Sequence, residues 1–252
     1  MIFYYSATGN TESLVKKIAE KTSDKVMNIE DAIRDNVYDY QMSDNERLGF
    51  GFPVYYGDVP DIFVQFAEKL TVKSADHYYG YIVVTDGGMS ESAPDHLVQI
   101  LLRRGITING VFGLKTVDTS ALYKDQWSQE LWNALKPEVE LKSSMIAEQI
   151  YDRTTGKHAQ PSMFPKFSTL MMKPLYALMR RTSLFSVSDK CTHCGLCAKN
   201  CPIHAIEMQD NRPVWVKSKC MTCLRCLHHC PVEAIDFSSF TKGKDRYKRP
   251  IV

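Results

Sequence analysis

The chain has 252 residues, of which 44% are hydrophobic, so it can bury a core of ordinary size as one large domain or two modest ones. Its formal net charge is only +2, but residues 1–150 carry 14 basic and 22 acidic side chains, whereas residues 151–252 carry 17 and 7. This asymmetry predicts two units with different surfaces. All eight cysteines lie between Cys191 and Cys230, which argues against a secreted disulfide scaffold and favours metal binding.

The first residues lead directly into a strand-like segment, with no basic start, long apolar region or cleavage site. We therefore expect no signal peptide. No apolar run approaches the roughly 18 residues of a membrane span. The sequence predicts a soluble cytoplasmic protein.

Strand and helix patterns alternate over the first 150 residues. The expected strands lie at residues 1–5, 25–29, 48–55, 79–85 and 106–117. The expected helices lie at residues 11–21, 62–70, 94–104, 124–135 and 137–151. This alternation predicts an α/β fold with a doubly wound, five-stranded parallel sheet over residues 1–152.

A polar stretch at residues 152–160 reads as a linker or loop, and residues 153–187 are expected to link two domains through an amphipathic helix. Its apolar residues recur at helical spacing: Phe164, Phe167, Met171, Leu175 and Leu178. Pro174 should kink or interrupt this helix. We prefer the interpretation that the apolar side packs between two domains. The alternative is a helix that binds a membrane surface or a partner, which the basic residues Lys173, Arg180 and Arg181 support.

Two runs of cysteines repeat at an interval of 29 residues, and each reads C-x2-C-x2-C-x3-C-P. The runs are Cys191, Cys194, Cys197 and Cys201, then Cys220, Cys223, Cys226 and Cys230. Similar text follows them, PIHAIE and PVEAID, which indicates an internal duplication. Three thiolates at this spacing can wrap three irons of a cubic cluster, and the fourth iron needs a ligand from elsewhere. Zinc sites use paired C-x2-C but have no use for a third cysteine at the same interval.

Residues 188–236 resemble a bacterial two-cluster ferredoxin, a family that carries single electrons, and we expect a small α+β domain over residues 188–240. In that family the cysteine before proline serves the other cluster. The resemblance therefore implies one 4Fe-4S cluster on Cys191, Cys194, Cys197 and Cys230, and another on Cys220, Cys223, Cys226 and Cys201. The histidines among them, His193, His204, His228 and His229, are expected to be exposed or bonded to backbone. We expect residues 241–252 to form a solvated basic tail.

The opening segment SATGNT, residues 6–11, follows a strand and precedes a helix. Its small residues let backbone N–H groups line an anion site at a helix N-terminus, and side chains add donors at Ser6, Thr8, Asn10 and Thr11. It matches neither the ATP-binding loop G-x4-G-K-[ST] nor the dinucleotide-binding pattern G-x-G-x-x-G. A phosphomonoester therefore fits this loop better than ATP or a dinucleotide does. The segment resembles the flavodoxin phosphate loop [ST]-x-T-G-x-T, met here by Ser6, Thr8, Gly9 and Thr11. An ordinary strand-to-helix turn with a threonine N-cap is the alternative.

Two further loops lie where flavodoxins hold the flavin ring, beyond the ends of the third and fourth expected strands. The first contributes Pro53, Tyr55, Tyr56, Gly57 and Asp58. The resemblance implies that a tyrosine stacks on the ring and that the Gly57–Asp58 peptide flips toward it, which glycine permits. A simple turn with two packed tyrosines is the alternative. The second loop contributes Thr85, Gly87 and Gly88 and lacks the aromatic residue of many flavodoxins, so one ring face is open or covered by the C-terminal module.

The order of the two domains resembles that of flavodoxin–ferredoxin fusion proteins. The resemblance implies FMN, two 4Fe-4S clusters and redox partner proteins, with no nucleic acid. We expect an electron-transfer protein that relays single electrons between FMN and the clusters. One alternative is an FMN-dependent reductase of a quinone, nitro compound or metal chelate; another is a redox-sensing or scaffold protein whose basic tail binds an acidic partner. His77 and His96 are isolated, so we expect no catalytic acid–base set.

Overall fold

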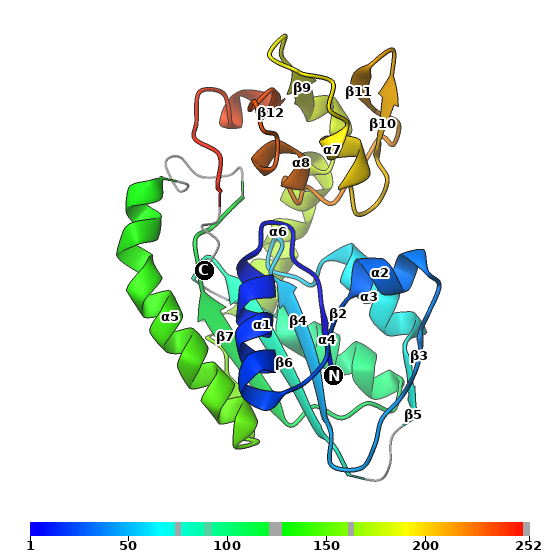
Figure 1. The fold of residues 1–252 in the computed structure, drawn as a ribbon, viewed down its shortest axis with the longest axis vertical. Coiled ribbons are helices and arrows are strands. Elements are labelled where there is room, and N and C mark those ends of the chain that lie inside the picture. Colours follow the sequence, from blue (N-terminus) through cyan, green and yellow to red (C-terminus); the bar gives the residue numbers. More distant parts are fainter. Residues whose placement is uncertain (74–76, 89, 91, 121–127, 161–163, 249–252) are drawn as a thin grey trace.

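A computed structural model describes residues 1–73, 77–88, 90, 92–120, 128–160 and 164–248. The chain forms two stacked parts, with the N-terminal part below and the cysteine-rich part above in Figure 1. We call the first part, residues 1–160, the sheet module, and the second, residues 182–248, the cysteine module. None of the helices within the described residues is long and apolar enough to cross a membrane.

The sheet module is built on six parallel strands in the order β2-β1-β4-β6-β7-β8. They are β1 (Ile2–Tyr4), β2 (Val26–Asn28), β4 (Arg47–Pro53), β6 (Tyr79–Asp86), β7 (Gly110–Lys115) and β8 (Gly156–His158). This order is that of flavodoxin-like sheets, with the switch point between β1 and β4. The expected doubly wound α/β fold is confirmed.

The sheet has one strand more than the five that the sequence predicts. Strand β8 comes from the polar segment 152–160, which we expected to be a linker, and it extends the sheet past residue 152. All three of its residues are exposed, and it pairs only with the edge of β7. Backbone hydrogen bonds hold this strand, so no apolar alternation marks it in the sequence.

Helices cover both faces of the sheet (Figure 1). On one face α1 (Asn10–Thr22) packs with α5 (Gln129–Tyr151). On the other lie α2 (Ile29–Arg34), α3 (Asp61–Lys69) and α4 (Ala93–Arg103). The predicted helices at 11–21, 62–70 and 94–104 are confirmed as α1, α3 and α4. Short elements were missed: α2, and a parallel pair of β3 (Asp39–Gln41) with β5 (Thr71–Lys73).

Helix α5 is a single helix where the sequence predicts two, at 124–135 and 137–151. Pro137 lies inside it, and buried side chains pack on both sides of the proline, at Trp132 and Ile146. The packing of both halves therefore outweighs the hydrogen bond that proline removes. Residues 124–127 of the predicted helix lie outside the described residues.

Helix α6 (Pro165–Met179) joins the two modules, and it too continues through a proline, Pro174. The predicted interruption is therefore wrong. Proline costs a helix one hydrogen bond and a steric conflict, but contacts on either side, at Thr169 and Met179, hold both halves in place.

The cysteine module shows the duplication in three dimensions. Its elements are η1 (Thr182–Leu184), β9 (Phe185–Val187), α7 (Leu196–Lys199), β10 (Ile206–Gln209), β11 (Arg212–Trp215), α8 (Arg225–His228), β12 (Ile235–Phe237) and η2 (Ser238–Phe240). Strand β9 pairs with β12 and β10 with β11, both antiparallel. The first residues of α7 and α8 are 29 positions apart, as the cysteine runs are.

The segment after residue 240 is packed at three positions and solvated at others. Thr241, Arg246 and Tyr247 are buried, and Arg246 donates to Asp236 at 2.8 Å and to the carbonyl of Ile235 at 3.0 Å. The expected solvated tail is therefore wrong at Thr241, Arg246 and Tyr247, whereas Lys242, Gly243, Asp245 and Lys248 are exposed as expected. Residues 249–252 lie outside the described residues.

Candidate functional site

The loop between β1 and α1 has the shape of an anion site. Gly9 caps α1 with a φ of 93°, a left-handed conformation that favours glycine. Its N–H donates to Oγ of Ser6 at 3.1 Å, which closes the loop. The hydroxyls of Thr11 and Thr85 lie 2.7 Å apart and are buried, so this loop is tied to the end of β6. The free N–H groups at the start of a 13-residue helix favour an anion here.

The loop after β4 makes a tight turn. Tyr55 and Asp58 exchange two backbone hydrogen bonds, and φ is positive at both central residues, 51° at Tyr56 and 78° at Gly57. These angles are those of a type I′ turn, in which a bulky residue such as tyrosine is strained. Such strain in a loop that lines a cavity is typical of functional sites.

The loops after β1, β4, β6 and β7 line a cavity of about 430 Å³ together with residues of α1, α6 and the cysteine module, and we call it the loop cavity. Eleven of the thirteen predicted cofactor residues line it: Ser6, Thr8, Asn10, Thr11, Pro53, Tyr55, Tyr56, Gly57, Thr85, Gly87 and Gly88. Gly9 faces a neighbouring groove, and Asp58 instead accepts a hydrogen bond from His96. Met89 and Glu91 of the second predicted ring loop lie outside the described residues.

The loop cavity has further walls that the sequence did not indicate. Residues 116–120, after β7, form one of them, and Ser168 and Met172 of α6 form another. Thr169, on the same helix, donates to the carbonyl of Gly57 at 3.0 Å and shares a hydrogen bond of 2.7 Å with Ser92. Helix α6 therefore covers the turn at Tyr56 and Gly57 and holds its peptide in one orientation.

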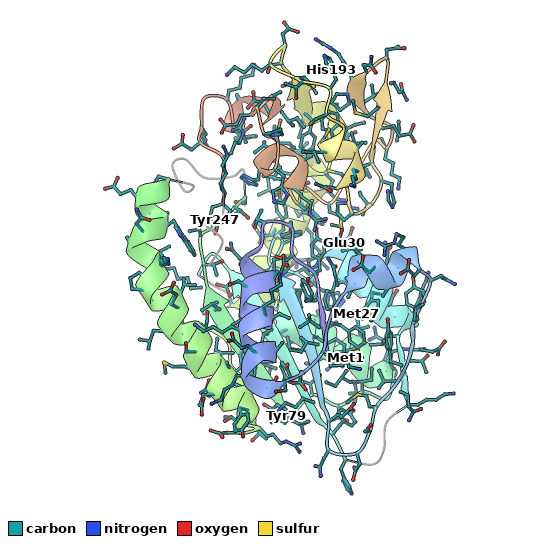
Figure 2. All side chains as sticks on the ribbon, in the orientation of Figure 1. Met1, Met27, Glu30, Tyr79, His193 and Tyr247 are labelled. Atoms are coloured by element: carbon teal, nitrogen blue, oxygen red, sulfur yellow. The ribbon has the colours of Figure 1, made fainter. Side chains whose placement is uncertain are left out.

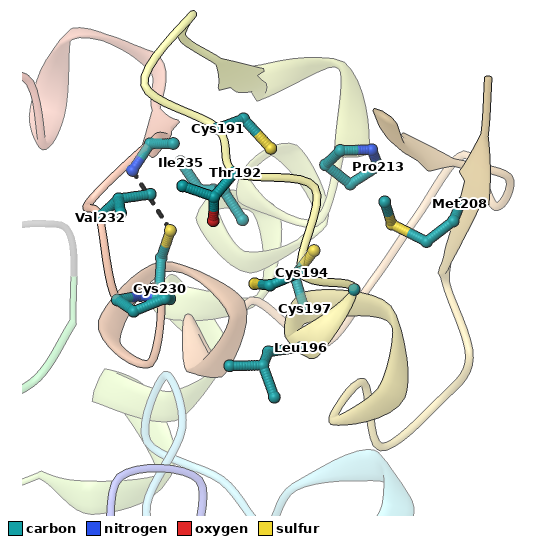
Figure 3. Close-up of a pocket in the computed structure, with 13 residues that line it drawn as sticks. Cys191, Thr192, Cys194, Leu196, Cys197, Met208, Pro213, Cys230, Val232 and Ile235 are labelled. Atoms are coloured by element: carbon teal, nitrogen blue, oxygen red, sulfur yellow. Dashed lines mark hydrogen bonds between the residues drawn. The ribbon is translucent and has the colours of Figure 1, made fainter. Parts of the chain in front are cut away.

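Each predicted set of four cysteines surrounds a small cavity in the cysteine module. Figure 3 shows the first, which is lined by Cys191, Cys194, Cys197 and Cys230. Its counterpart is lined by Cys201, Cys220, Cys223 and Cys226. No three His, Cys, Asp or Glu side chains of the described residues converge closely enough to hold a single metal ion. In both sets the cysteine before proline lies with the three cysteines of the other run.

The backbone around the two cysteine cavities repeats at the same 29-residue interval. Positive φ angles occur in matched pairs, at His193 and Thr222, Gly195 and Leu224, and His204 and Glu233. The N–H of Ala205 donates to Cys201 Sγ at 3.2 Å, and the N–H of Ala234 donates to Cys230 Sγ at 3.3 Å. Backbone donors aimed at sulfur favour thiolate ligands, and hydrogen bonds of this kind tune 4Fe-4S clusters.

The two kinds of cavity meet at one cysteine. Cys223 lines both the second cysteine cavity and the loop cavity, and Thr222 lines the loop cavity beside it. The hydroxyl of Tyr5, at the end of β1, is buried without a hydrogen-bond partner among the described residues and interacts with Cys223. Burial holds the pKa of this hydroxyl well above its usual value, so it remains a donor. A cluster sulfur at this position would accept a hydrogen bond from this hydroxyl.

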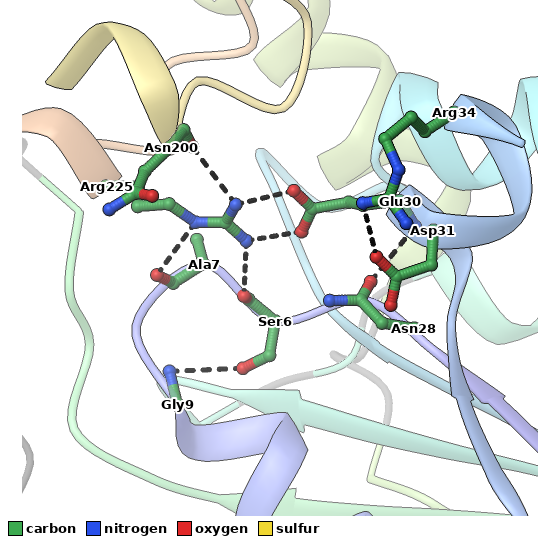
Figure 4. A network of polar contacts seen from close by, with 9 residues as sticks. All are labelled: Ser6, Ala7, Gly9, Asn28, Glu30, Asp31, Arg34, Asn200 and Arg225. Atoms are coloured by element: carbon green, nitrogen blue, oxygen red, sulfur yellow. Dashed lines mark hydrogen bonds and ion pairs between the residues drawn. The ribbon is translucent and has the colours of Figure 1, made fainter. Parts of the chain in front are cut away.

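A buried arginine joins the cysteine module to the anion loop (Figure 4). Arg225, which lies between Cys223 and Cys226, donates to the carbonyl of Ser6 at 2.6 Å and to that of Ala7 at 3.3 Å. It also forms a bidentate ion pair with Glu30, with both contacts at 2.6 Å. The loop that carries two of the cysteines is therefore fixed to the loop that presents an anion site.

Two more contacts bind the modules together. His228 donates from Nε2 to the carbonyl of Thr119 at 3.1 Å, and burial lowers the pKa of His228 to about 4, so it is neutral. Its Nδ1 accepts the backbone N–H of Tyr247 at 3.2 Å. Tyr247 lies where the two modules meet (Figure 2). Its hydroxyl donates to Oδ1 of Asn10, at the start of α1, at 2.6 Å.

The other three histidines of the cysteine module are exposed: His193, His204 and His229. His193 hydrogen-bonds through Nδ1 to the carbonyl of Asn211. His228 is buried and bonds through Nε2 to a backbone carbonyl, so it also meets the expectation of an exposed or backbone-bonded histidine.

Two family models match the chain. A flavodoxin domain model matches residues 1–93, and a 4Fe-4S dicluster domain model matches residues 183–231. The chain is a flavodoxin–ferredoxin fusion protein. Its flavodoxin domain implies a flavin and its dicluster domain implies 4Fe-4S clusters, so the fusion protein has a redox or electron-transfer role that involves redox partners.

Several solved structures resemble the fusion protein. The Trp repressor binding protein of Bacillus subtilis is 12% identical with a TM-score of 0.37, over 62% of this chain and 98% of that one. Rubredoxin oxygen:oxidoreductase of Desulfovibrio gigas is 17% identical with a TM-score of 0.35, over 59% and 36%. An azoreductase of Bacillus anthracis is 11% identical with a TM-score of 0.32, over 60% and 98%. No curated protein sequence matches the chain.

Proposed function

We propose that the fusion protein relays single electrons between FMN and two 4Fe-4S clusters. One observation carries this proposal: Cys223 lines the same cavity as the anion loop and the two predicted ring loops. FMN exchanges two electrons one at a time, and each 4Fe-4S cluster exchanges one. A cluster ligand in the wall of a flavin cavity leaves no need for a diffusing carrier between the two groups.

The residues of the loop cavity fit a flavin mononucleotide. The N–H groups at the start of α1, with the hydroxyls of Ser6 and Thr8, would hold a phosphate without a lysine. The turn at Tyr56 and Gly57 would bind one side of the ring, and Gly87 and Gly88 would let the backbone approach the other. A Cβ atom at Gly87 would lie 2.9 Å from Cβ of Asp118, so glycine at this position also lets the loop pack against the loop at residues 116–120.

The two cysteine sets fit two cubic clusters. We assign Cys191, Cys194, Cys197 and Cys230 to a distal cluster, and Cys201, Cys220, Cys223 and Cys226 to a proximal cluster beside the loop cavity. Cys194 is exposed and Cys220 is buried, which supports an entry point for electrons at the distal cluster. A redox partner protein would then dock on the cysteine module, far from the sheet.

The contacts between the modules support a fixed relay. Arg225, His228 and Tyr247 each join the cysteine module to a loop or helix end at the loop cavity. Their buried contacts keep the proximal cysteine set against the cavity, so transfer would be intramolecular at a high effective concentration. The charges of the two parts, acidic before residue 150 and basic after it, also favour this docking.

The first test is the absorbance spectrum of the protein prepared without oxygen, with iron, acid-labile sulfide and flavin measured per chain. The relay requires about eight irons, about eight sulfides and one FMN, as expected for two cubic clusters and one flavin. Iron and sulfide without flavin, even after FMN is added, would rule out the relay.

The second test is stopped-flow reduction of the loaded protein by a reduced ferredoxin, followed at cluster and flavin wavelengths. The relay predicts that flavin reduction follows cluster reduction at a rate independent of protein concentration, because the step is intramolecular. Independent reduction of the two groups would contradict it. Steady turnover of a quinone, nitro compound or metal chelate would favour the reductase instead.

A further inference from the structure

Helix α6 turns one face inward. Ser168 and Met172 line the loop cavity, Thr169 bonds to Gly57 and Met179 is buried. These contacts fix the orientation of the helix on the rest of the protein, so the opposite face must point outward.

The outward face is apolar. Of the five side chains expected to pack between the modules, Leu175 packs against the core and the other four are exposed. Four large side chains recur on the outward face at positions i, i+3, i+4 and i+11, and a fifth precedes the helix. Their exposed fractions are 65% for Phe167, 59% for Leu170, 58% for Met171, 50% for Leu178 and 66% for Phe164. An exposed, contiguous stripe of this kind marks an interaction surface.

The two exposed charges described on α6 and directly after it, Lys173 and Arg181, are both positive. From residue 153 to residue 188 the sequence contains six basic residues and no acidic one. Two nearby carboxylates are already paired, that of Asp61 with Arg180 at 2.7 Å and that of Asp58 with His96 at 2.6 Å. The outward face therefore presents apolar side chains together with positive charge.

We propose that the outward face of α6 binds an anionic lipid surface. An amphipathic helix with large apolar side chains and basic neighbours lies in the plane of the membrane interface. Its 15 residues are too few to cross a bilayer, which requires about 20. A second copy of the chain is a poor occupant, because a two-fold interface would bring Lys173 and Arg181 against the same residues of the partner.

Lipid binding at this face has a consequence for the site. The side of α6 opposite the lipid lines the loop cavity through Ser168 and Met172. The cavity would thus lie about one helix diameter, roughly 10 Å, from the membrane interface. The cysteine module would remain open to water-soluble partners at Cys194.

The test is co-sedimentation of the full-length, cofactor-loaded protein with lipid vesicles. Vesicles of equal parts phosphatidylcholine and phosphatidylglycerol are compared with vesicles of phosphatidylcholine alone. We expect binding to the anionic vesicles, weaker binding to the neutral ones, and loss of binding as salt concentration rises.

Matched variants locate the surface. The double substitution Phe167→Ser with Met171→Ser should lower the partition coefficient by about tenfold or more, because two large apolar side chains no longer enter the lipid. Lys173→Glu with Arg181→Glu should abolish the preference for anionic vesicles. The control is Leu141→Ser with Met145→Ser, which removes two side chains of α5 that are also exposed, and it should bind as the wild type does. Iron and flavin contents equal to those of the wild type show that each variant is folded.

Several outcomes would overturn the proposal. They are no binding of the wild type to anionic vesicles, equal losses in the α5 control, or a wild-type dimer in sedimentation equilibrium that the Phe167 and Met171 variant dissociates. If the double variant does not fold, Phe167→Trp gives a second readout. Its fluorescence should shift to the blue with anionic vesicles and be quenched by brominated lipid chains, and an unchanged spectrum would count against the proposal. None of these outcomes depends on the electron relay.

Discussion

Arg225 and Glu30 form a bidentate ion pair with both contacts at 2.6 Å, although 195 positions separate them in the sequence. The same guanidinium binds the carbonyls of Ser6 and Ala7 and is buried. It therefore links the geometry of the anion loop to that of the cysteine loop between Cys223 and Cys226.

We expect Arg225→Lys to weaken the attachment of the anion loop and that of the cysteine loop. A lysine cannot make the bidentate pair and the two carbonyl contacts together. The free energy of unfolding should fall by about 2 kcal/mol, and the dissociation constant for FMN should rise by about tenfold. Denaturant unfolding and flavin fluorescence titration measure the two effects. Arg212→Lys, which alters an exposed ion pair with Asp189 in the same module, should leave both values unchanged.

Tyr5→Phe should lower the reduction potential of the proximal cluster. The buried hydroxyl of Tyr5 has no partner among the described residues, and a hydrogen bond from it to a cluster sulfur would stabilise the more negative, reduced cluster. Loss of one such bond corresponds to roughly 20–60 mV for one electron. Potentiometric titration followed by electron paramagnetic resonance measures it. Tyr81→Phe removes another buried, unpartnered hydroxyl within the sheet and should leave the potential unchanged.

Thr169→Val should raise the reduction potential of the bound flavin. The hydroxyl of Thr169 holds the carbonyl of Gly57, and without it the peptide turns more easily toward the flavin. One hydrogen bond is worth about 1 kcal/mol, which corresponds to about 40 mV for one electron. Thr169→Ser keeps the hydroxyl and serves as the control. An equal shift in both variants would mean that the lost methyl group or the packing matters instead.

Cys230→Ser and Cys201→Ser should affect different clusters. Cys230 lies with Cys191, Cys194 and Cys197, so its loss should damage the distal cluster, while Cys201→Ser should damage the proximal one and slow flavin reduction. Iron analysis and electron paramagnetic resonance distinguish the two. We assign the cysteine before proline in each run to the cluster that the other run holds. This assignment would be wrong if each substitution removed the cluster of its own cysteine run.

The pair of His96 and Asp58 should make stability depend on pH. Its hydrogen bond to Asp58 raises the pKa of His96, while Lys173 and Arg103 oppose the shift. Because the folded-state pKa is raised, the pair stabilises the protein fully below about pH 6.5, and this contribution is lost as the pH rises through the folded-state value. The pair is half exposed, so we expect only about 0.5 kcal/mol. Unfolding curves of the wild type and Asp58→Asn should differ at pH 5.5 and converge at about pH 8.

Local patterns predicted most of the fold. The buried strands and amphipathic helices of the sheet module carry apolar periodicity, and the cysteine spacing marks the duplicated module. Strand β8 escaped prediction because an exposed edge strand has no such periodicity. The continuity of the helices through Pro137 and Pro174 was not predicted, because tertiary packing decides whether a helix tolerates proline.

The site was predictable where its residues follow a strand in a motif, as Ser6, Thr11 and Gly87 do. Arg225, Thr169 and the loop at residues 116–120 could not be found in this way, because they reach the cavity from elements remote in sequence. The sequence does show an arginine between two cluster cysteines. Its contacts with Ser6 and Glu30, however, depend on how the two modules pack together.

The contact between Tyr247 and Asn10 has a consequence for the synthesis of the protein. The helix that would hold the phosphate is synthesised well before the hydroxyl that secures its first residue, which lies 237 positions later. A nascent chain that is still attached to the ribosome at residue 247 therefore lacks part of its nucleotide site. We therefore expect flavin to bind firmly only once the segment that contains Tyr247 has left the ribosome and folded.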